Sequence, residues 1–231
     1  DPAALLEVVE GEKGILATIA RGAVLIDSST VSPPATLRVR AALAARGADM
    51  LDAPVFGSKN EAENGALGLI VGGEPEVIAR VQPVLDAMGR TIHVGGNGAG
   101  AYAKLVVNLV IAGTLAAFNE GMVVATKAGI DPEVMVRVLL ASRARSGIIE
   151  MKAPQVLQRD FTPFFPLHLM AKDMRLLRES AEALAVRVPL ADVLSRCYEA
   201  CLAGGLGDQD YCATIKPLET QAGVAVAAAA P

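Results

Sequence analysis

The hydrophobic pattern of the chain changes in kind near Gly98. Before that residue, short apolar runs alternate with amphipathic stretches, and the connections are short. The apolar runs predict four buried strands, at Gly22–Asp27, Met50–Val55, Gly68–Gly72 and Thr91–Val94. The amphipathic stretches predict helices at Pro2–Glu10, Pro33–Arg46 and Pro75–Met88. This alternation indicates an α/β fold with an open parallel sheet.

No strand pattern follows Gly98. Five helices are predicted instead, at Gly100–Lys127, Pro132–Leu140, Ile148–Leu157, Leu167–Leu184 and Leu190–Leu202. We therefore expect an α/β domain over residues 1–98, an all-helical domain over residues 99–219, and a frayed tail over residues 220–231. The first of these helices would be roughly 40 Å long, so we expect it to join the two domains.

This long helix carries Lys104 and Asn108, which are four residues apart and therefore share one face. Their neighbours are apolar, so no broad polar face is available to them. Two alternatives are a solvated lysine and a transmembrane segment over Leu105–Ala125. Polar residues interrupt that segment, and no basic cluster flanks it. We predict that the pair is buried or faces a cleft, where a lysine indicates a functional site.

Polar residues also follow two of the predicted strands. Ser29 and Thr30 come after the first strand, and Gly57 and Ser58 come after the second. In open α/β sheets, ligands bind at the carboxyl ends of the strands. The sequence therefore predicts that all four residues are candidate binding residues.

The predicted helix at Leu167–Leu184 carries Lys172 and Asp173. Adjacent helical residues point about 100° apart, so we expect the two not to pair side by side. One would face a cleft, and the other would be held by the scaffold; an ordinary charged turn is the alternative. The preceding aromatic residues, Phe161, Phe164 and Phe165, are more typical of a core than of a cofactor wall.

Composition narrows the function classes. The chain has 21 basic and 25 acidic residues, spread along its length, which does not favour nucleic acid as a partner. Three cysteines without a ligand cluster predict reduced thiols in a cytoplasmic protein, without a disulfide framework or a metal site. His93 and His168 have no nearby acid or nucleophile pattern, so we interpret both as structural.

Taken in order, four motifs resemble those of the β-hydroxyacid dehydrogenase family. They are Asp27-Ser28-Ser29-Thr30 with Pro33, Asp52 to Ser58, Gly95 to Asn108, and Lys172-Asp173. The resemblance runs from residue 1 to about Lys216. Within the family, Gly57-Ser58-Lys59 and Phe164 to Leu167 resemble the glyoxylate/succinic semialdehyde reductases.

The resemblance implies a Rossmann-type first domain and hydride transfer between NADP, or NAD, and a small carboxylate substrate. Lys104 matches the catalytic lysine, and Asn108 matches the residue that orients it or the substrate. Gly57 and Ser58 match the loop that binds the substrate carboxylate. The residues that match the cofactor side are Ser29, Thr30, Phe165 and Lys172. We also expect a homo-oligomer, a dimer or a tetramer, and no membrane partner.

Two departures from the family pattern stand out. Phe56 occupies a position where family members usually have a serine, so one expected carboxylate donor is missing. The sequence also lacks a Gly-x-Gly-x-x-Gly between a first strand and its helix, so we expect it to begin roughly seventy residues into the family fold. Two alternatives therefore stay open: 3-hydroxyisobutyrate or tartronate semialdehyde chemistry, and a non-catalytic fragment that self-associates.

Overall fold

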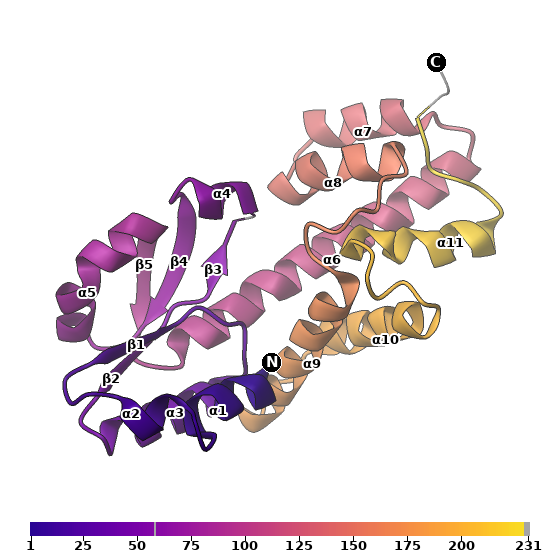
Figure 1. Cartoon of the computed structure of the whole chain (residues 1–231). Helices are drawn as coiled ribbons and strands as arrows, with labels where there is room; N and C mark the ends of the chain where they lie inside the picture. The colour runs from indigo at the N-terminus through magenta and orange to yellow at the C-terminus, as the bar shows by residue number, and fades with distance from the viewer. Residues whose placement is uncertain (58, 229–231) are drawn as a thin grey trace. The chain divides into compact units, whose positions relative to one another are not determined.

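The structure is a computed structural model that describes residues 1–57 and 59–228. The chain divides into two compact units, of which the first comprises Asp1–Val107 with Leu176–Arg187. The second comprises Asn108–Arg175 with Val188–Pro231. Within the described residues, the strands belong to the first unit and the second unit is helical (Figure 1). The predicted fold class, an α/β part followed by an all-helical part, is confirmed.

The stretch Asp49–Phe56 contributes two strands to the sheet of the first unit. Its first half, β2 (Asp49–Asp52), pairs in parallel with β1 (Val24–Asp27). Its second half, β3 (Val55–Phe56), pairs antiparallel with β4 (Leu67–Gly72), which in turn pairs in parallel with β5 (Gly89–Gly95). The sheet is therefore rich in parallel pairs but mixed. A short connection such as that between β3 and β4 permits only an antiparallel neighbour.

Helices cover both faces of this sheet. They are α1 (Pro2–Glu10), α2 (Ile15–Thr18), α3 (Pro33–Ala44) and α5 (Pro75–Met88), while the short helix α4 (Lys59–Glu63) lies in the connection between β3 and β4. Successive residues of a strand point to opposite faces. Accordingly, Met50 is buried in a cluster with Val39 of α3, whereas Leu51 is buried in a second cluster with Leu85 of α5. The strand tips are thus held on a sheet that is packed from both sides.

The second unit packs its helices around one large core. They are the greater part of α6 (Ala99–Lys127), then α7 (Pro132–Ala141), α8 (Gly147–Leu157), α9 up to Arg175 (Leu167–Ala183 as a whole), α10 (Pro189–Ala203), the 3-10 turn η1 (Tyr211–Thr214) and α11 (Ile215–Ala222). The core includes Leu115 and Met122 of α6 and Leu167 and Met174 of α9, each at most 1% exposed. α6 begins in the first unit and crosses the boundary at Asn108.

Three sequence predictions about secondary structure are corrected. The strand predicted over Met50–Val55 is interrupted at Ala53-Pro54, since proline has no N–H to donate to a ladder. The helices α4 and α11 were not predicted. The tail predicted to be frayed packs on the second unit over its described residues: Val226 is fully buried, and the N–H of Ala228 donates to Leu157 O at 2.9 Å.

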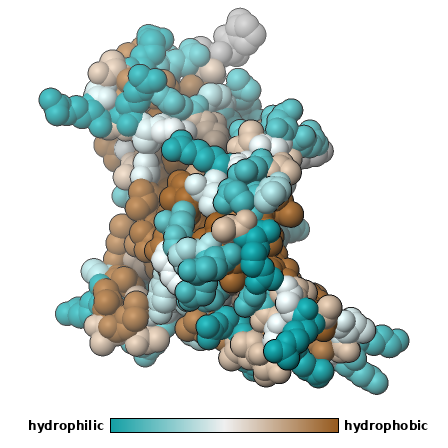
Figure 2. All heavy atoms as spheres, turned by 90° about the vertical axis from the view of Figure 1, so that its left-hand side faces the viewer, coloured by the Kyte–Doolittle hydropathy of each residue, from teal (hydrophilic) through white to brown (hydrophobic). Residues whose placement is uncertain are grey.

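α6 is long and apolar enough to cross a membrane by length and composition alone, and one third of its most apolar window is buried. Polar residues along it contact other helices: Asn108 is 3% exposed and Asn119 is 1% exposed, and both are hydrogen bonded. Its exposed side includes Val106, Val110 and Val124. Hydrophobic residues also reach the surface on the face shown in Figure 2. The buried asparagines favour a helix of a protein core.

Candidate functional site

Asp52, the last residue of β2, caps the beginning of α6. It is 2% exposed, and its carboxylate accepts hydrogen bonds from Gly98 N at 2.9 Å and Ala101 N at 3.0 Å. The first N–H groups of a helix have no intrahelical partner, so an anion there satisfies them and complements the helix dipole. Burial raises the pKa of Asp52, and the bonds from Gly98 and Ala101 oppose that rise. Asp52 thereby fixes where α6 begins.

The first turn of α6 lies directly on the backbone of the sheet. A Cβ atom on Gly100 would lie 2.6 Å from Asp52 O and 2.7 Å from Ile70 O. A Cβ atom on Gly72, at the end of β4, would lie 2.8 Å from Gly100 N. Backbone atoms cannot move aside as flexible side chains do, so this contact requires glycine on both sides. The glycine-rich entry predicted from the sequence is therefore a close-packing device.

Lys104 lies one turn after Gly100 on this anchored helix. It is partly buried, between Ala101 at 2% and Leu105 at 0% exposure. Asp52 and Gly100 set the position of the helix from which its side chain extends. Because the helix is anchored, the position of the Lys104 backbone is fixed, and its partial burial removes part of its hydration. Both properties suit an ammonium group that donates a proton.

Asn108 is fixed from a different helix. Its Nδ2 donates to Asp173 Oδ2 of α9 at 2.6 Å, and the two residues are 3% and 0% exposed. Lys172 Nζ lies 3.1 Å from Asp173 Oδ1. The prediction that Lys172 and Asp173 would not pair side by side is therefore wrong, because a long, flexible lysine side chain can reach a neighbouring carboxylate although the two Cα–Cβ bonds diverge. The prediction that one of the two is held by the scaffold agrees with the full burial of Asp173.

The tip of β1 presents a buried acceptor. Ser29 is exposed and Thr30 is partly buried, and Ser29 N donates to Asp27 Oδ1 at 3.0 Å. Asp27 is 6% exposed, and its Oδ2 is buried without a hydrogen-bond partner among the described residues. Buried polar atoms are normally paired, so this tip suits a ligand that donates a hydroxyl or amide hydrogen.

Gly57 follows β3 with a φ of 116°, in the region that favours glycine. Because β3 is antiparallel to β4, Gly57 lies beside the first residues of β4, whereas β1 ends opposite Asp52. The two predicted strand tips are therefore set apart along the sheet. Ser58 lies outside the described residues. The ring of Phe56 covers Gly68, where a Cβ atom would lie 1.9 Å from Phe56 Cζ.

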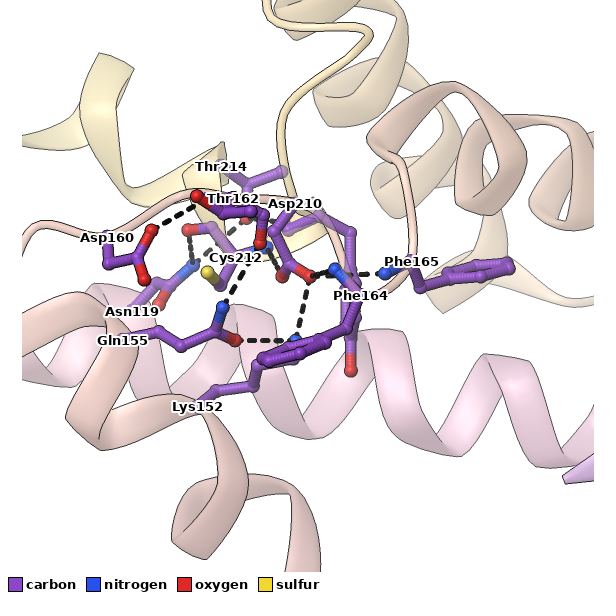
Figure 3. A network of polar contacts seen from close by, with 11 residues as sticks. Asn119, Lys152, Gln155, Asp160, Thr162, Phe164, Phe165, Asp210, Cys212 and Thr214 are labelled. Atoms are coloured by element: carbon purple, nitrogen blue, oxygen red, sulfur yellow. Dashed lines mark hydrogen bonds and ion pairs between the residues drawn. The ribbon is translucent and has the colours of Figure 1, made fainter. Parts of the chain in front are cut away.

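Phe165 lies in the segment that leads into α9. Its N–H donates to Asp210 Oδ2 at 3.3 Å, and its carbonyl accepts from Tyr211 N at 3.1 Å. Its ring meets the Tyr211 ring edge-on, with centroids 5.9 Å apart. Figure 3 shows the Phe165 ring directed away from the polar network that holds its backbone. Of the aromatic cluster predicted as core, Phe161 is buried, whereas Phe164 is 68% exposed.

Three carboxylates that hold other residues in place, Asp52, Asp173 and Asp210, were not among the predicted site residues. Asp52 ends an apolar strand, so a charge at the end of a buried run was the available signal there. Asp173 lies on a helix with several other charged residues, so the sequence did not single it out as the buried one. Asp210 gave no such local signal, because its partner Lys152 lies 58 residues away.

Sequence models of two protein families match the chain. Residues 1–96 match the NAD binding domain of 6-phosphogluconate dehydrogenase. Residues 98–218, more than half of the chain, match the NAD-binding domain of NADP-dependent 3-hydroxyisobutyrate dehydrogenase. The chain belongs to the β-hydroxyacid dehydrogenase family. The resemblance drawn from the motifs is confirmed, and with it the class of NAD(P)-dependent oxidoreductase.

Several known members of the family are similar along most of this β-hydroxyacid dehydrogenase. It is 36% identical to 2-(hydroxymethyl)glutarate dehydrogenase of Eubacterium barkeri, over 95% of this chain and 73% of that protein. It is 35% identical to 2-hydroxy-3-oxopropionate reductase of Escherichia coli, over 94% and 74% of the two chains. Glyoxylate/succinic semialdehyde reductase 1 of Arabidopsis thaliana is 32% identical over 95% and 76%. These identities leave the substrate unassigned.

The fold is also that of a solved relative. The crystal structure of 3-hydroxyisobutyrate dehydrogenase from Salmonella typhimurium superposes with a TM-score of 0.85 at 30% identity, over 94% of this chain and 76% of that one. The cofactor class is NAD(P), as the two matched domains indicate. The unpaired Asp27 Oδ2 beside Ser29 and Thr30 fits such a cofactor, whose ribose and carboxamide carry hydrogen-bond donors.

Proposed function

We propose that this β-hydroxyacid dehydrogenase reduces a small aldehyde acid, glyoxylate or succinic semialdehyde, with Lys104 as the general acid. The observation that carries the proposal is the placement of Lys104 one helical turn after the turn capped by Asp52, and one turn before Asn108, which Asp173 holds. A general acid acts efficiently only when it is positioned within reach of the proton acceptor.

In the proposed reaction, the reduced nicotinamide, when bound, supplies the hydride that reaches the aldehyde carbon. The Lys104 ammonium stabilises the negative charge that develops on the carbonyl oxygen and donates a proton to it, which yields the hydroxy acid. In the oxidation direction, the neutral amine of Lys104 accepts that proton. Asn108 orients the lysine or the substrate. The backbone N–H groups of the Gly57 turn, with the Ser58 hydroxyl, bind the substrate carboxylate.

On the cofactor side, we assign Ser29 and Thr30 to the strand tip that contacts the cofactor, and Phe165 and Lys172 to the nicotinamide end. The unpaired Asp27 Oδ2 supports the first assignment. The fixed backbone of Phe165 supports the second. NADP is proposed over NAD, and cytoplasmic location and homo-oligomerisation stay predictions from the sequence.

The test is NADPH oxidation with glyoxylate and with succinic semialdehyde, by a version of the chain that carries the upstream region expected from the family resemblance. Lys104→Ala is expected to lower kcat by about 10²- to 10⁴-fold, the usual contribution of a general acid. Lys127→Ala, at the other end of α6, is the matched control, since Lys127 Nζ donates only to Ala222 O in the hydrogen bonds described. A Lys104→Ala variant that keeps its rate would remove Lys104 from this role.

Two other functions stay under test. The 35% identity to 2-hydroxy-3-oxopropionate reductase favours tartronate semialdehyde as an alternative substrate, and 3-hydroxyisobutyrate is a further one. Relative kcat/KM values on the four compounds decide among them. The absence of Gly-x-Gly-x-x-Gly from the 231 residues motivates a non-catalytic role in self-association. NADPH binding by the 231-residue chain, measured by calorimetry, would count against that role.

A further inference from the structure

Lys152 of α8 and Asp210 form a fully buried ion pair in the second unit. Lys152 Nζ lies 2.9 Å from Asp210 Oδ2 and 2.7 Å from Gln155 Oε1, and the two charged side chains are 1% and 0% exposed (Figure 3). The cost of removing two charges from water offsets most of their attraction, so such a pair is weak evidence of added stability. The geometry around Asp210 indicates what the pair does instead.

The Asp210 carboxylate is the common acceptor for the segment that leads into α9. Oδ2, the oxygen that Lys152 contacts, also accepts from Phe164 N at 3.0 Å and Phe165 N at 3.3 Å, and Oδ1 accepts from Cys212 N at 3.1 Å. Both oxygens of the carboxylate therefore act as acceptors, and Lys152 is the donor among these that carries a charge.

Tyr211 connects the same pair to the Phe165 side chain. Lys152 Nζ lies 4.7 Å from the centroid of the Tyr211 ring, and that ring meets the Phe165 ring edge-on. The N–H of Tyr211 also donates to Phe165 O. Asp210 therefore holds the N–H of Phe165, and Tyr211 holds its carbonyl and its ring.

We propose that Lys152 and Asp210 are positioning residues that set the Phe165 ring for the bound nicotinamide cofactor. That Phe165 contacts the nicotinamide cofactor rests on the proposed function. The coupling between the ion pair and Phe165 does not depend on it. Lys152 touches no ligand itself. It acts through Asp210, and Asp210 acts through the backbone of Phe165.

A second ion pair of the same unit provides a matched control. Arg159 pairs with Glu219, which is 4% exposed, and the Arg159 guanidinium lies 5.1 Å from the Phe161 ring centroid. The hydrogen bonds described for this pair involve neither Phe164 nor Phe165. Breaking it removes a buried charge partner without loosening the Phe165 backbone.

A fluorescence probe tests the coupling without turnover. The chain contains no tryptophan, so Phe165→Trp in the 231-residue chain reports on one position. In that background we expect Lys152→Met to raise acrylamide quenching by about twofold and to lower the anisotropy, because the segment gains motion. Asp210→Asn, which keeps the side-chain volume, should act in the same direction. Arg159→Met should leave both quantities unchanged. Equal changes in Lys152→Met and Arg159→Met would overturn the proposal.

A double-mutant cycle in the version used for the activity test measures the consequence for the cofactor. Lys152→Met is expected to raise the Kd of NADPH about five- to tenfold, and to have no further effect in a Phe165→Ala background, because coupled residues are not additive. The same fold-change in both backgrounds would overturn the positioning role. Lys104→Ala should leave the Kd of NADPH unchanged. The Kd therefore tests the role of Lys152, and kcat separately tests the role of Lys104.

Discussion

Asn108 Nδ2 donates a hydrogen bond of 2.6 Å to Asp173 Oδ2, and both residues are buried. An ionised carboxylate only accepts, so the amide nitrogen of Asn108 faces Asp173, and its amide oxygen turns away from it. Lys172 reaches the other oxygen of the same carboxylate. Asp173 therefore orders two residues that the proposed function assigns to substrate and cofactor.

The first prediction is that Asp173→Asn lowers kcat/KM by about 10- to 100-fold, the effect of losing one hydrogen bond to a charged group. It should also lower the free energy of unfolding by about 1–3 kcal/mol, since an amide cannot accept from Asn108 and Lys172 with both its terminal atoms. Steady-state kinetics and urea denaturation measure the two quantities. Glu150→Gln, which breaks an exposed ion pair with Arg145, is the control and should change neither by much. A kcat/KM within twofold of the wild type would contradict the prediction.

The second prediction concerns the contact between α6 and the sheet. Gly100→Ala introduces a Cβ atom 2.6 Å from Asp52 O, so we expect a loss of about 1–3 kcal/mol in the free energy of unfolding. Activity should fall as well, because the displaced helix carries Lys104. Gly96→Ala is the matched control from the same glycine-rich segment, since its Cβ atom would meet no atom within 4 Å. Equal thermal midpoints for the two variants would show that the close contact is absent in solution.

The third prediction is a pH dependence of stability. Burial raises the pKa of Asp52 above its ordinary value near 3.8, so the native state holds this proton more tightly than the unfolded state does. Stability from this group is therefore fully present below about pH 3.8 and is lost as the pH rises through the raised pKa. The stability difference between wild type and Asp52→Asn should shrink over that interval and then level off. Urea denaturation at a series of pH values measures it, and a difference that grows with pH has the wrong sign.

At neutral pH we still expect Asp52→Asn to be less stable than the wild type by about 0.5–2 kcal/mol, the range for a lost helix cap. In the wild type, Gly98 N donates to one carboxylate oxygen of Asp52 and Ala101 N to the other. The substitution replaces one of these oxygens by an NH₂ group, which cannot accept. Asp49→Asn, at the other end of β2, changes an exposed ion pair with Arg80 and serves as the control.

The fourth prediction addresses Phe56, at the position where the family resemblance leads us to expect a serine. Its ring lies over Gly68 and is 40% exposed, so Phe56→Ser should alter stability little. The added hydroxyl restores a donor for the substrate carboxylate, and we expect KM for glyoxylate to fall by about tenfold, the worth of one hydrogen bond to a charged group. Phe56→Ala separates this effect from the loss of the ring. If both variants lower KM equally, the hydroxyl has no role.

The order of strands and helices could be predicted from the sequence because hydrophobic period is a local property. α5 matches its predicted bounds, and α6 begins one residue before its predicted start. Family membership was also readable, since Lys104, Asn108 and Lys172 stand in short motifs in a fixed order.

Tertiary structure alone decided how the sheet pairs and what holds the site residues. The stretch Asp49–Phe56 runs parallel to β1 and antiparallel to β4, and hydrophobic period carries no information about strand direction. The partners Asp52 with Gly98, Asn108 with Asp173, and Lys152 with Asp210 are separated by 46, 65 and 58 residues. A buried charge needs its partner in space and not in sequence, so the chain specifies the charges, and only the fold shows which of them meet.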